Sequence, residues 1–386
     1  MGVEQEFSRA AARMLAHVEN GTTDWAPEVR RVAVDDYINA DRWQREMEEI
    51  FRRQPLMLAL SIELPGPGAF KTLEVAGKPV LLTRAKDGVV RAFLNVCSHR
   101  QAVLAPAGCG HASRFTCPYH GWTYSADGKL MGVADRQKFG EVDTSELGLV
   151  QLPCAEQAGM IFASLTPDAA FDLEAFLAGF LPDLAWLGLE GWYHHCVHEI
   201  EGACWKVVTD GFVEGYHFAA AHPDTIHLST MSNVMTYDFF GPHQRVGFPR
   251  HTIGEMRGTP EAEMYKQEGA YFGFVRFVFP NVAFSVAPTV GGTWTQIIPG
   301  ATPQKTTAYQ HIIFPKAPTT DEERAAYQST ADFYRTVVTT EDFELGFRIQ
   351  KGLESGAFKN MVFGRNEWGN QHHHASIDRY ICGPGK

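Results

Sequence analysis

The spacing of apolar and polar residues divides the chain into stretches of different character. Residues 35–53 repeat apolar positions at helical intervals, begin with acidic residues and end with arginines, which predicts an amphipathic helix. From about residue 58 to residue 165, short apolar runs are separated by turn signals such as PGPG at 65–68. This pattern is typical of a small all-β domain.

The remainder of the chain mixes helices and strands. Residues 166–190 return to helical spacing and are expected to connect two domains. Helical spacing recurs at 205–221 and over a long segment at 320–354. The apolar runs that predict strands are 194–205, 271–287, 293–300 and 306–315.

These patterns together predict an α+β chain in three parts. An N-terminal helical segment, residues 1–45, is expected to pack with the larger domain. Residues 46–165 form the small β domain, and residues 166–386 form the larger domain, with an antiparallel sheet flanked by helices.

Composition narrows the class of protein. The chain has 386 residues, of which 45% are hydrophobic and 20% charged, as in a soluble globular protein large enough for two cores. A formal net charge of -11 argues against a nucleic-acid partner. No apolar run is long enough to span a membrane, and the first residues lack a signal-peptide core, so we expect a cytoplasmic protein. The 7 cysteines, odd in number and sparse, fit reduced thiols or metal ligands.

Two short Cys/His pairs lie in loops of the predicted β domain. They are Cys97-x-His99 and Cys117-x2-His120. Zinc accepts two Cys and two His, but zinc fingers pair Cys with Cys and His with His. A [2Fe–2S] cluster with Cys on one iron and His on the other takes one of each from each loop, because each loop then spans both irons. The spacing therefore predicts a cluster site, and Gly121 suits a tight turn around it.

A second set of candidate ligands lies in the segment TDGFVEGYHFAAAHP. Glu214, His217 and His222 fall within nine residues, and Asp210 lies one helical turn before Glu214. A mononuclear non-haem iron that activates O2 binds two His and one carboxylate. Five residues on an ideal helix separate the two imidazoles by about 140°, so they can bind one ion only if the helix is distorted or ends near Pro223.

Four segments resemble those of a known family. CSHR at 97–100 and CPYHGWTY at 117–124 resemble the Rieske motif. EGYHFAAAHP at 214–223 and EDFELGFRIQKGL at 341–353 resemble the iron-binding segments of Rieske non-haem iron oxygenase α subunits, the aromatic-ring-hydroxylating dioxygenase-like family. The resemblance implies a Rieske [2Fe–2S] domain followed by a helix-grip, START-like catalytic domain.

The resemblance also implies ligands for both metal centres. The expected ligands of the [2Fe–2S] cluster are Cys97, His99, Cys117 and His120. The expected ligands of the mononuclear Fe(II) are His217, His222 and Asp342. Asp210 and Glu214 are the expected catalytic acids. Spacing alone does not distinguish Asp342 from a solvated helix acid, and Glu341 and Asp210 are the next candidates. The histidines at 372–374 are expected to be structural or exposed.

Two residues depart from the family pattern. Many of these oxygenases have Gly at the position of Gln101. Arene dioxygenases have Asp where Glu214 stands, whereas Glu resembles the branch of carnitine, choline and glycine betaine monooxygenases. The family's head-to-tail homotrimer brings the cluster of one subunit to the iron of the next. Glu214 is therefore expected to link His120 of one subunit to His217 of its neighbour.

The resemblance implies a terminal oxygenase that uses O2 to hydroxylate or oxidatively demethylate a small substrate. The chain has no dinucleotide-binding fingerprint, so NAD(P)H is expected to act only through a separate reductase, with or without a ferredoxin. We expect an aromatic or otherwise apolar substrate, with a quaternary ammonium compound as the alternative. An electron-transfer protein and a zinc-stabilised lipid-binding module are further alternatives, which iron content and colour distinguish. Five phenylalanines either line the substrate pocket or pack the sheet: Phe272, Phe274, Phe277, Phe279 and Phe284.

Overall fold

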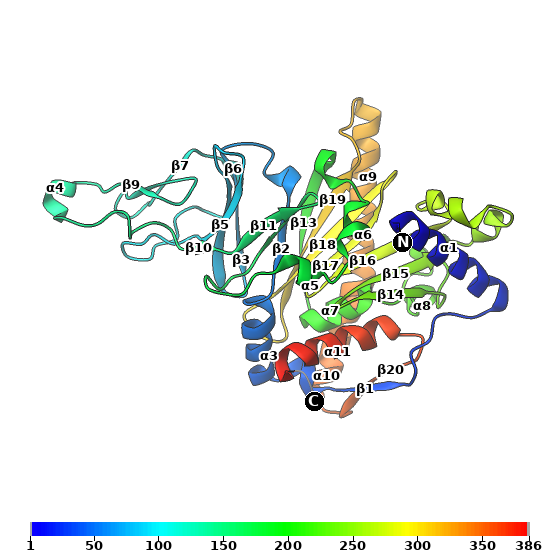
Figure 1. The fold of residues 1–386 in the computed structure, drawn as a ribbon. Coiled ribbons are helices and arrows are strands. Elements are labelled where there is room, and N and C mark those ends of the chain that lie inside the picture. The colour runs from blue at the N-terminus through cyan, green and yellow to red at the C-terminus, as the bar shows by residue number, and fades with distance from the viewer. Residues whose placement is uncertain (1, 384–386) are drawn as a thin grey trace. The chain divides into compact units, whose positions relative to one another are not determined.

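The computed structural model describes residues 2–383. They form two compact units (Figure 1). The larger unit joins the N-terminal segment through Glu46 with the chain from Leu177 onward, and the smaller unit is Met47–Phe176. No helix among these residues is long and apolar enough to cross a membrane.

The smaller unit consists of three antiparallel sheets, which confirms the predicted all-β domain. Their strand orders are β10-β5-β4-β3-β6, β11-β12-β2 and β7-β8-β9. The elements are β2 (Leu56–Leu60), β3 (Ala69–Val75), β4 (Lys78–Arg84), β5 (Val90–Leu94), β6 (Gly108–His111), β7 (Arg114–Thr116), β8 (Thr123–Ser125), β9 (Leu130–Gly132), α4 (Arg136–Phe139), β10 (Gln151–Leu152), β11 (Cys154–Gln157) and β12 (Met160–Ala163). The unit extends beyond the expected boundary at residue 165, because the Thr166 hydroxyl donates to the Arg52 carbonyl at 3.0 Å.

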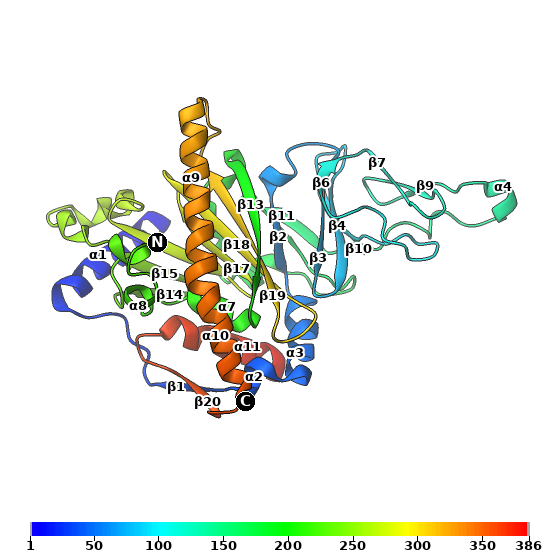
Figure 2. The same ribbon diagram turned by 180° about the vertical axis from the view of Figure 1, so that it is seen from behind.

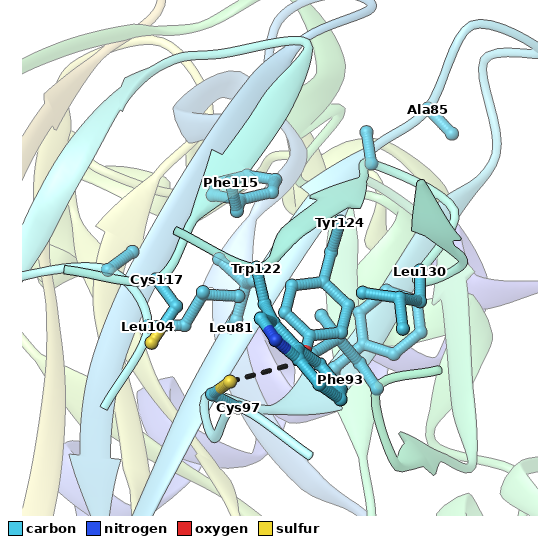
Figure 3. Packing of buried hydrophobic residues seen from close by; sticks show 13 residues of the cluster. Leu81, Ala85, Phe93, Cys97, Leu104, Phe115, Cys117, Trp122, Tyr124 and Leu130 are labelled. Atoms are coloured by element: carbon cyan, nitrogen blue, oxygen red, sulfur yellow. Dashed lines mark hydrogen bonds between the residues drawn. The ribbon is translucent and has the colours of Figure 1, made fainter. Parts of the chain in front are cut away.

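An aromatic cluster forms the core of the smaller unit. Phe93, Phe115, Trp122 and Tyr124 are each at most 5% exposed and pack together with aliphatic side chains such as Leu81 (Figure 3). Both cysteines of the two Cys/His pairs belong to the same cluster. The loops that carry the candidate ligands therefore start from a closely packed, buried core.

The larger unit is organised around a seven-stranded antiparallel sheet of order β13-β19-β18-β17-β16-β15-β14. Its strands are β13 (Tyr193–Gly202), β14 (Thr236–Phe240), β15 (His243–Pro249), β16 (Phe272–Val278), β17 (Val282–Ala287), β18 (Gly291–Pro299) and β19 (Thr306–Phe314). A separate ribbon pairs β1 (Arg30–Ala33) with β20 (Asn360–Phe363). The α+β fold with a large antiparallel sheet is confirmed.

Strand β15 was not predicted, because it carries polar residues that are buried in ion pairs. Arg245 of β15 and Arg276 of β16 are 2% and 0% exposed. Asp183 binds both guanidinium groups at 2.5 Å, and Glu268 binds Arg276 at 2.9 Å. Both guanidinium groups also lie over the ring of Phe7, 4.7 and 5.2 Å from its centre. These partners replace the water that the charges lose on burial.

Helices flank the sheet. They are α1 (Val3–Asn20), α2 (Asp35–Ile38), α3 (Ala40–Glu46), α6 (Leu181–Ala185), α7 (Trp205–Phe212), α8 (Phe218–Ala221), α9 (Asp321–Val337), α10 (Phe343–Glu354) and α11 (Trp368–Cys382), and α5 (Leu173–Leu177) lies at the boundary of the units. A π-helical turn, Val338–Asp342, joins α9 to α10. The predicted helix at 35–53 is divided, because the Asn39 side chain accepts from the Arg42 backbone N–H at 2.9 Å and starts a new helix.

The two faces of the sheet pack against different helices. Phe274 of β16 contacts Phe7 of α1, with ring centres 5.5 Å apart. Phe277, which points to the opposite face of the same strand, contacts His373 of α11 at 5.3 Å. The continuous α9–α10 segment crosses the α11 face (Figure 2). The candidate iron ligands lie on this helical side of the sheet.

Candidate metal centres

Two loops of the smaller unit have the same backbone hydrogen bonds. In the first, the N–H of Cys97 donates to Ala102 at 2.9 Å, and the N–H of Gln101 donates back to Cys97 at 3.0 Å. In the second, the N–H of Cys117 donates to Trp122 at 2.7 Å, and the N–H of Gly121 donates to Cys117 at 3.0 Å. The two Cys/His pairs therefore sit on two turns of the same construction.

These turns require a left-handed residue at equivalent positions. Gly121 has φ +71°, which costs glycine little. Gln101 occupies the matching position with φ +60°, although it has a side chain. The departure from the family pattern at Gln101 thus leaves the loop conformation unchanged and adds backbone strain.

At these turns the two histidines approach each other, and the two cysteines lie in one buried cluster. Cys97 and Cys117 are 1% and 3% exposed, and the rings of His99 and His120 are 4.6 Å apart. His99 stacks on Trp122 at 4.7 Å. Its Nδ1 is buried without a hydrogen-bond partner among the described residues. Two buried thiols and two neighbouring imidazoles, one with an unpaired ring nitrogen, are the donor set of a [2Fe–2S] cluster of the mixed Cys/His type.

Tyr124 adds a contact that the sequence did not predict. Its hydroxyl lies 3.2 Å from Cys97 Sγ and accepts from the Ser98 backbone N–H at 3.0 Å (Figure 3). Burial, together with the neighbouring Cys97 thiol, raises the pKa of Tyr124 to about 12. The hydroxyl therefore keeps its proton and can donate it in a hydrogen bond to the sulfur.

In the larger unit, a break in the helix brings the two histidines of the second motif together. Helix α7 ends at Phe212, and α8 is a single turn flanked by His217 and His222. The helical segment predicted at 205–221 is therefore interrupted between Phe212 and Phe218. The break removes the angular separation that an ideal helix would impose, so both rings can face one point.

Asp342 completes a three-residue group with these histidines. Its Oδ1 lies 2.9 Å from His222 Nε2 and 3.7 Å from His217 Nε2. One ligand atom from each of the three residues lies within 4.8 Å of the others. Two imidazoles and one carboxylate in this arrangement are the donor set that non-haem Fe(II) takes in oxygenases.

Each imidazole of this group is also held by a second carboxylate. Glu214, which is 8% exposed, binds His217 Nδ1. Glu341 Oε2 binds His222 Nδ1 at 2.5 Å and accepts from the Thr225 hydroxyl at 2.7 Å. With both Nδ1 atoms occupied, both Nε2 atoms face Asp342, and the tautomer of each ring is set for binding metal through Nε2.

Burial and the carboxylates act in opposite directions on His222. Burial lowers the pKa of this imidazole, but hydrogen bonds and charge from Asp342 and Glu341 raise it more, so the net pKa is raised. Glu341 and Asp342 are consecutive residues at the end of the π-helical turn Val338–Asp342. Such turns are frequent at functional sites, and this one directs two neighbouring carboxylates to opposite edges of one ring.

Asp210 lies beside this group without belonging to it. Its carboxylate accepts from the Tyr37 hydroxyl at 2.7 Å and lies 3.0 Å from His374 Nε2. Burial, followed by the charge of Asp210, raises the pKa of Tyr37 well above its usual value. His374, one of the three consecutive histidines, is thus buried and hydrogen-bonded in a Tyr–Asp–His network.

A cavity of about 340 Å³ opens onto the three-residue group. Helices α7 and α10 and the inner face of the sheet line it, mostly with apolar side chains. None of the five phenylalanines proposed from the strands at 271–287 contributes to it. Its aromatic side chains are Phe212, Phe218, Phe248, Tyr334, Phe343 and Phe363.

Comparison with known families identifies this arrangement. The family model of the Rieske [2Fe-2S] domain matches residues 54–147, and that of the ring hydroxylating alpha subunit (catalytic domain) matches residues 185–383. A cluster domain followed by this catalytic domain defines the class of Rieske non-haem iron oxygenases. The chain belongs to the ring-hydroxylating alpha subunit family. It is a terminal oxygenase subunit with a [2Fe–2S] cluster, a mononuclear iron and O2 as co-substrate.

Relatives of this chain act on different substrates. The carnitine monooxygenase oxygenase subunit of Escherichia coli (strain K12) is 29% identical over 341 residues, which cover 84% of each chain. The anthranilate 1,2-dioxygenase large subunit of Acinetobacter baylyi is 32% identical over 224 residues, 55% of this chain and 47% of the relative.

Solved structures support the fold. A quaternary ammonium Rieske monooxygenase, CntA, has a TM-score of 0.80 at 25% identity and covers 92% of this chain and 96% of its own. The naphthalene 1,2-dioxygenase of Rhodococcus sp. has a TM-score of 0.74 at 19% identity over 99% of each chain. The second likeness concerns the fold alone.

Replacing Gln101 by glycine should stabilise the smaller unit. The substitution removes the left-handed strain at φ +60° and adds some unfolded-state entropy, for a net gain of about 0.5–1 kcal/mol. Denaturant unfolding followed through the visible absorption of the cluster measures the change. Gly121→Gln, at the equivalent position, should lose a similar amount. A destabilised Gln101→Gly variant would contradict the equivalence of the two loops.

Replacing Glu341 by glutamine should weaken iron binding. The amide keeps the size of the side chain but removes the charge that orients His222 and makes it more basic, so Fe(II) affinity should fall about 10-fold or more. Chelator competition on the full-length protein measures this. Glu344→Gln, on an exposed part of α10, is the matched control and should retain normal affinity. Equal affinities in the two variants would show that Glu341 does not support the ligand.

Proposed function

We propose that His217, His222 and Asp342 bind the catalytic Fe(II). The observation that supports this most directly is the convergence of their three ligand atoms within 4.8 Å at the edge of the cavity. We further propose that Cys97, His99, Cys117 and His120 hold the [2Fe–2S] cluster. The acids considered as replacements, Asp210 and Glu341, have other partners and are proposed to position the site.

The chain's own residues prepare the site for oxygen chemistry. When bound, the iron supplies the binding and reduction of O2, and the cluster delivers electrons one at a time. Glu214 and Glu341 fix the ring orientations of the histidines. The apolar cavity wall excludes water from the reacting carbon. The Tyr37 hydroxyl and His374 hold the Asp210 carboxylate in place beside the cavity, and we propose that this network fixes the position of α7 next to the iron ligands.

Electrons reach this subunit from a separate reductase, with a ferredoxin between them where the system has one. We propose that the subunit is a cytoplasmic homotrimer in which the cluster of one chain serves the iron of the next. His120 is only partly buried, so its ring is accessible to a second subunit. Glu214, already bound to His217, has lone pairs left to accept a hydrogen bond from that ring.

A second candidate function has one specific observation in its favour. The relative that covers 84% of this chain is named for carnitine, and Glu214 matches the pattern of quaternary ammonium monooxygenases. Aromatic side chains around the cavity could surround a quaternary ammonium group. The apolar lining favours an aromatic or other apolar substrate, which we propose as the first candidate.

Asp342→Ala should remove the mononuclear iron and spare the cluster. The change deletes the only carboxylate in the three-residue group, whereas the cluster ligands belong to the other compact unit. Iron should fall from about three to about two atoms per chain while the visible spectrum of the cluster persists. Asp332→Ala, on the exposed side of α9, is the control and should keep all the iron. Normal iron content in Asp342→Ala would require a different third ligand.

Glu214→Gln should impair electron transfer between subunits without loss of metal. The amide cannot link two imidazoles as the carboxylate does, so turnover should fall more than ~10-fold. Glu214→Asp should retain more activity, because it keeps the charge. Product-linked O2 consumption measures turnover, and sedimentation velocity verifies the trimer. A wild-type rate in Glu214→Gln, or a fully active monomer, contradicts the link.

A further inference from the structure

The cavity beside the iron ligands has an unbalanced set of charges. Asp210, Glu214, Asp342 and Glu367 line it, and no lysine or arginine does so among the described residues. Burial, and then the charges of Glu214 and Asp210, raise the pKa of Glu367. Bound Fe(II) would add two positive charges to a cavity that four carboxylic side chains line. With both cavity imidazoles, His217 and His222, used as iron ligands, a substrate carboxylate would lose its hydration and find no lysine or arginine among the described residues.

The sheet wall of the cavity contains a pair of hydroxyl groups without partners. Ser285 of β17 lies directly opposite Thr293 of β18, and both side chains line the cavity. Thr293 is 4% exposed. Neither hydroxyl has a hydrogen-bond partner among the described residues. Two uncharged donors and acceptors are therefore available to a bound molecule.

The next polar side chain along the sheet already has hydrogen-bond partners within the chain. Gln310 of β19 lies opposite Thr295 of β18 and also lines the cavity. Its amide already donates to the Tyr334 carbonyl at 3.3 Å and lies 3.3 Å from His198 Nδ1. Thr295 Oγ1 is buried with no partner within residues 2–383, although Thr295 itself does not line the cavity. The Ser285–Thr293 pair is therefore the polar part of the sheet wall that is open to the cavity and, within the described chain, unpaired.

Apart from Asn370, whose amide donates to the Asp210 carbonyl, most of the remaining wall is apolar. Val207 and Val208 of α7, Phe343 and Ile349 of α10 and Val275 of β16 contribute to it. A ligand that fills this space must therefore be largely hydrocarbon. The polar pair on β17 and β18 lies on the sheet, whereas the iron ligands lie on or next to α8 and α10.

We propose that the substrate is an uncharged molecule with an apolar body and one hydroxyl, carbonyl or amide group, which the Ser285–Thr293 pair binds, and that carboxylates are excluded. The inference rests on the proposed function, since it takes the cavity at His217, His222 and Asp342 to be the substrate site. It goes further by separating neutral substrates from the zwitterionic ones that carry a trimethylammonium group and a carboxylate.

The test is a binding experiment without turnover. Four probes are titrated into the dithionite-reduced, iron-loaded protein under anaerobic conditions by calorimetry: ethylbenzene, 4-ethylphenol, 4-ethylbenzoate and L-carnitine. 4-Ethylphenol should bind about 5-fold more tightly than ethylbenzene, because it gains one hydrogen bond. It should bind at least ~10-fold more tightly than 4-ethylbenzoate or L-carnitine, because a buried carboxylate has no cationic partner there. If the protein shows these differences in affinity but oxidises none of the probes, the proposed reaction is contradicted and the binding inference still holds.

Two substitutions at Thr293 distinguish the effect of its hydroxyl group from the effect of its side-chain volume. Thr293→Val keeps the volume and removes the hydroxyl, so 4-ethylphenol should bind only as well as ethylbenzene, whose affinity should stay within ~2-fold. Thr293→Ser keeps the hydroxyl and should retain the preference. Tighter binding of 4-ethylbenzoate or L-carnitine overturns the exclusion of carboxylates. The hydroxyl site is overturned if the wild type binds 4-ethylphenol and ethylbenzene equally, or binds neither measurably. It is also overturned if Thr293→Val keeps the preference for 4-ethylphenol.

Discussion

The imidazole of His222 is held at both nitrogens by the carboxylates of consecutive residues, Glu341 at Nδ1 and Asp342 at Nε2. Consecutive residues of a regular α-helix point about 100° apart, and the π-helical turn between α9 and α10 changes that relation. Because Glu341 fixes the ring at Nδ1, its Nε2 faces Asp342, as does Nε2 of His217. The direction of α8, and with it one wall of the cavity, follows from this contact.

The fold was predictable where one periodicity holds over a whole element. The β domain and the long helix at 320–354 have such patterns, and the helix forms as α9 and α10 with only the π-helical turn between them. Strand β15 was missed because Arg245 is buried by partners distant in the sequence. Helix α11 was missed because histidines and other polar residues, several of them buried, occupy its inward positions. In both cases tertiary contacts outweigh local preference.

Some residues of the candidate site were predictable from the sequence and others were not. Close spacing alone indicated the Cys/His pairs, since few structures other than a metal centre need that pattern. Asp342 required the family resemblance, because an acid on a helix is usually solvated. The contact between His222 and Glu341 joins residues 119 apart, and the Tyr124–Cys97 contact depends on how two loops pack. No periodicity encodes such pairs, so only the folded chain reveals them.

The matched hydrogen bonds of the two cluster loops have a consequence for electron transfer. Each turn is closed from both ends, and its cysteine is anchored in an aromatic core. A change of one unit of charge between such turns is met by fixed dipoles and by the Tyr124 hydroxyl, with little movement of the backbone. A cluster held between these turns would therefore have a small reorganisation energy, and its electron transfer would be governed by distance and driving force.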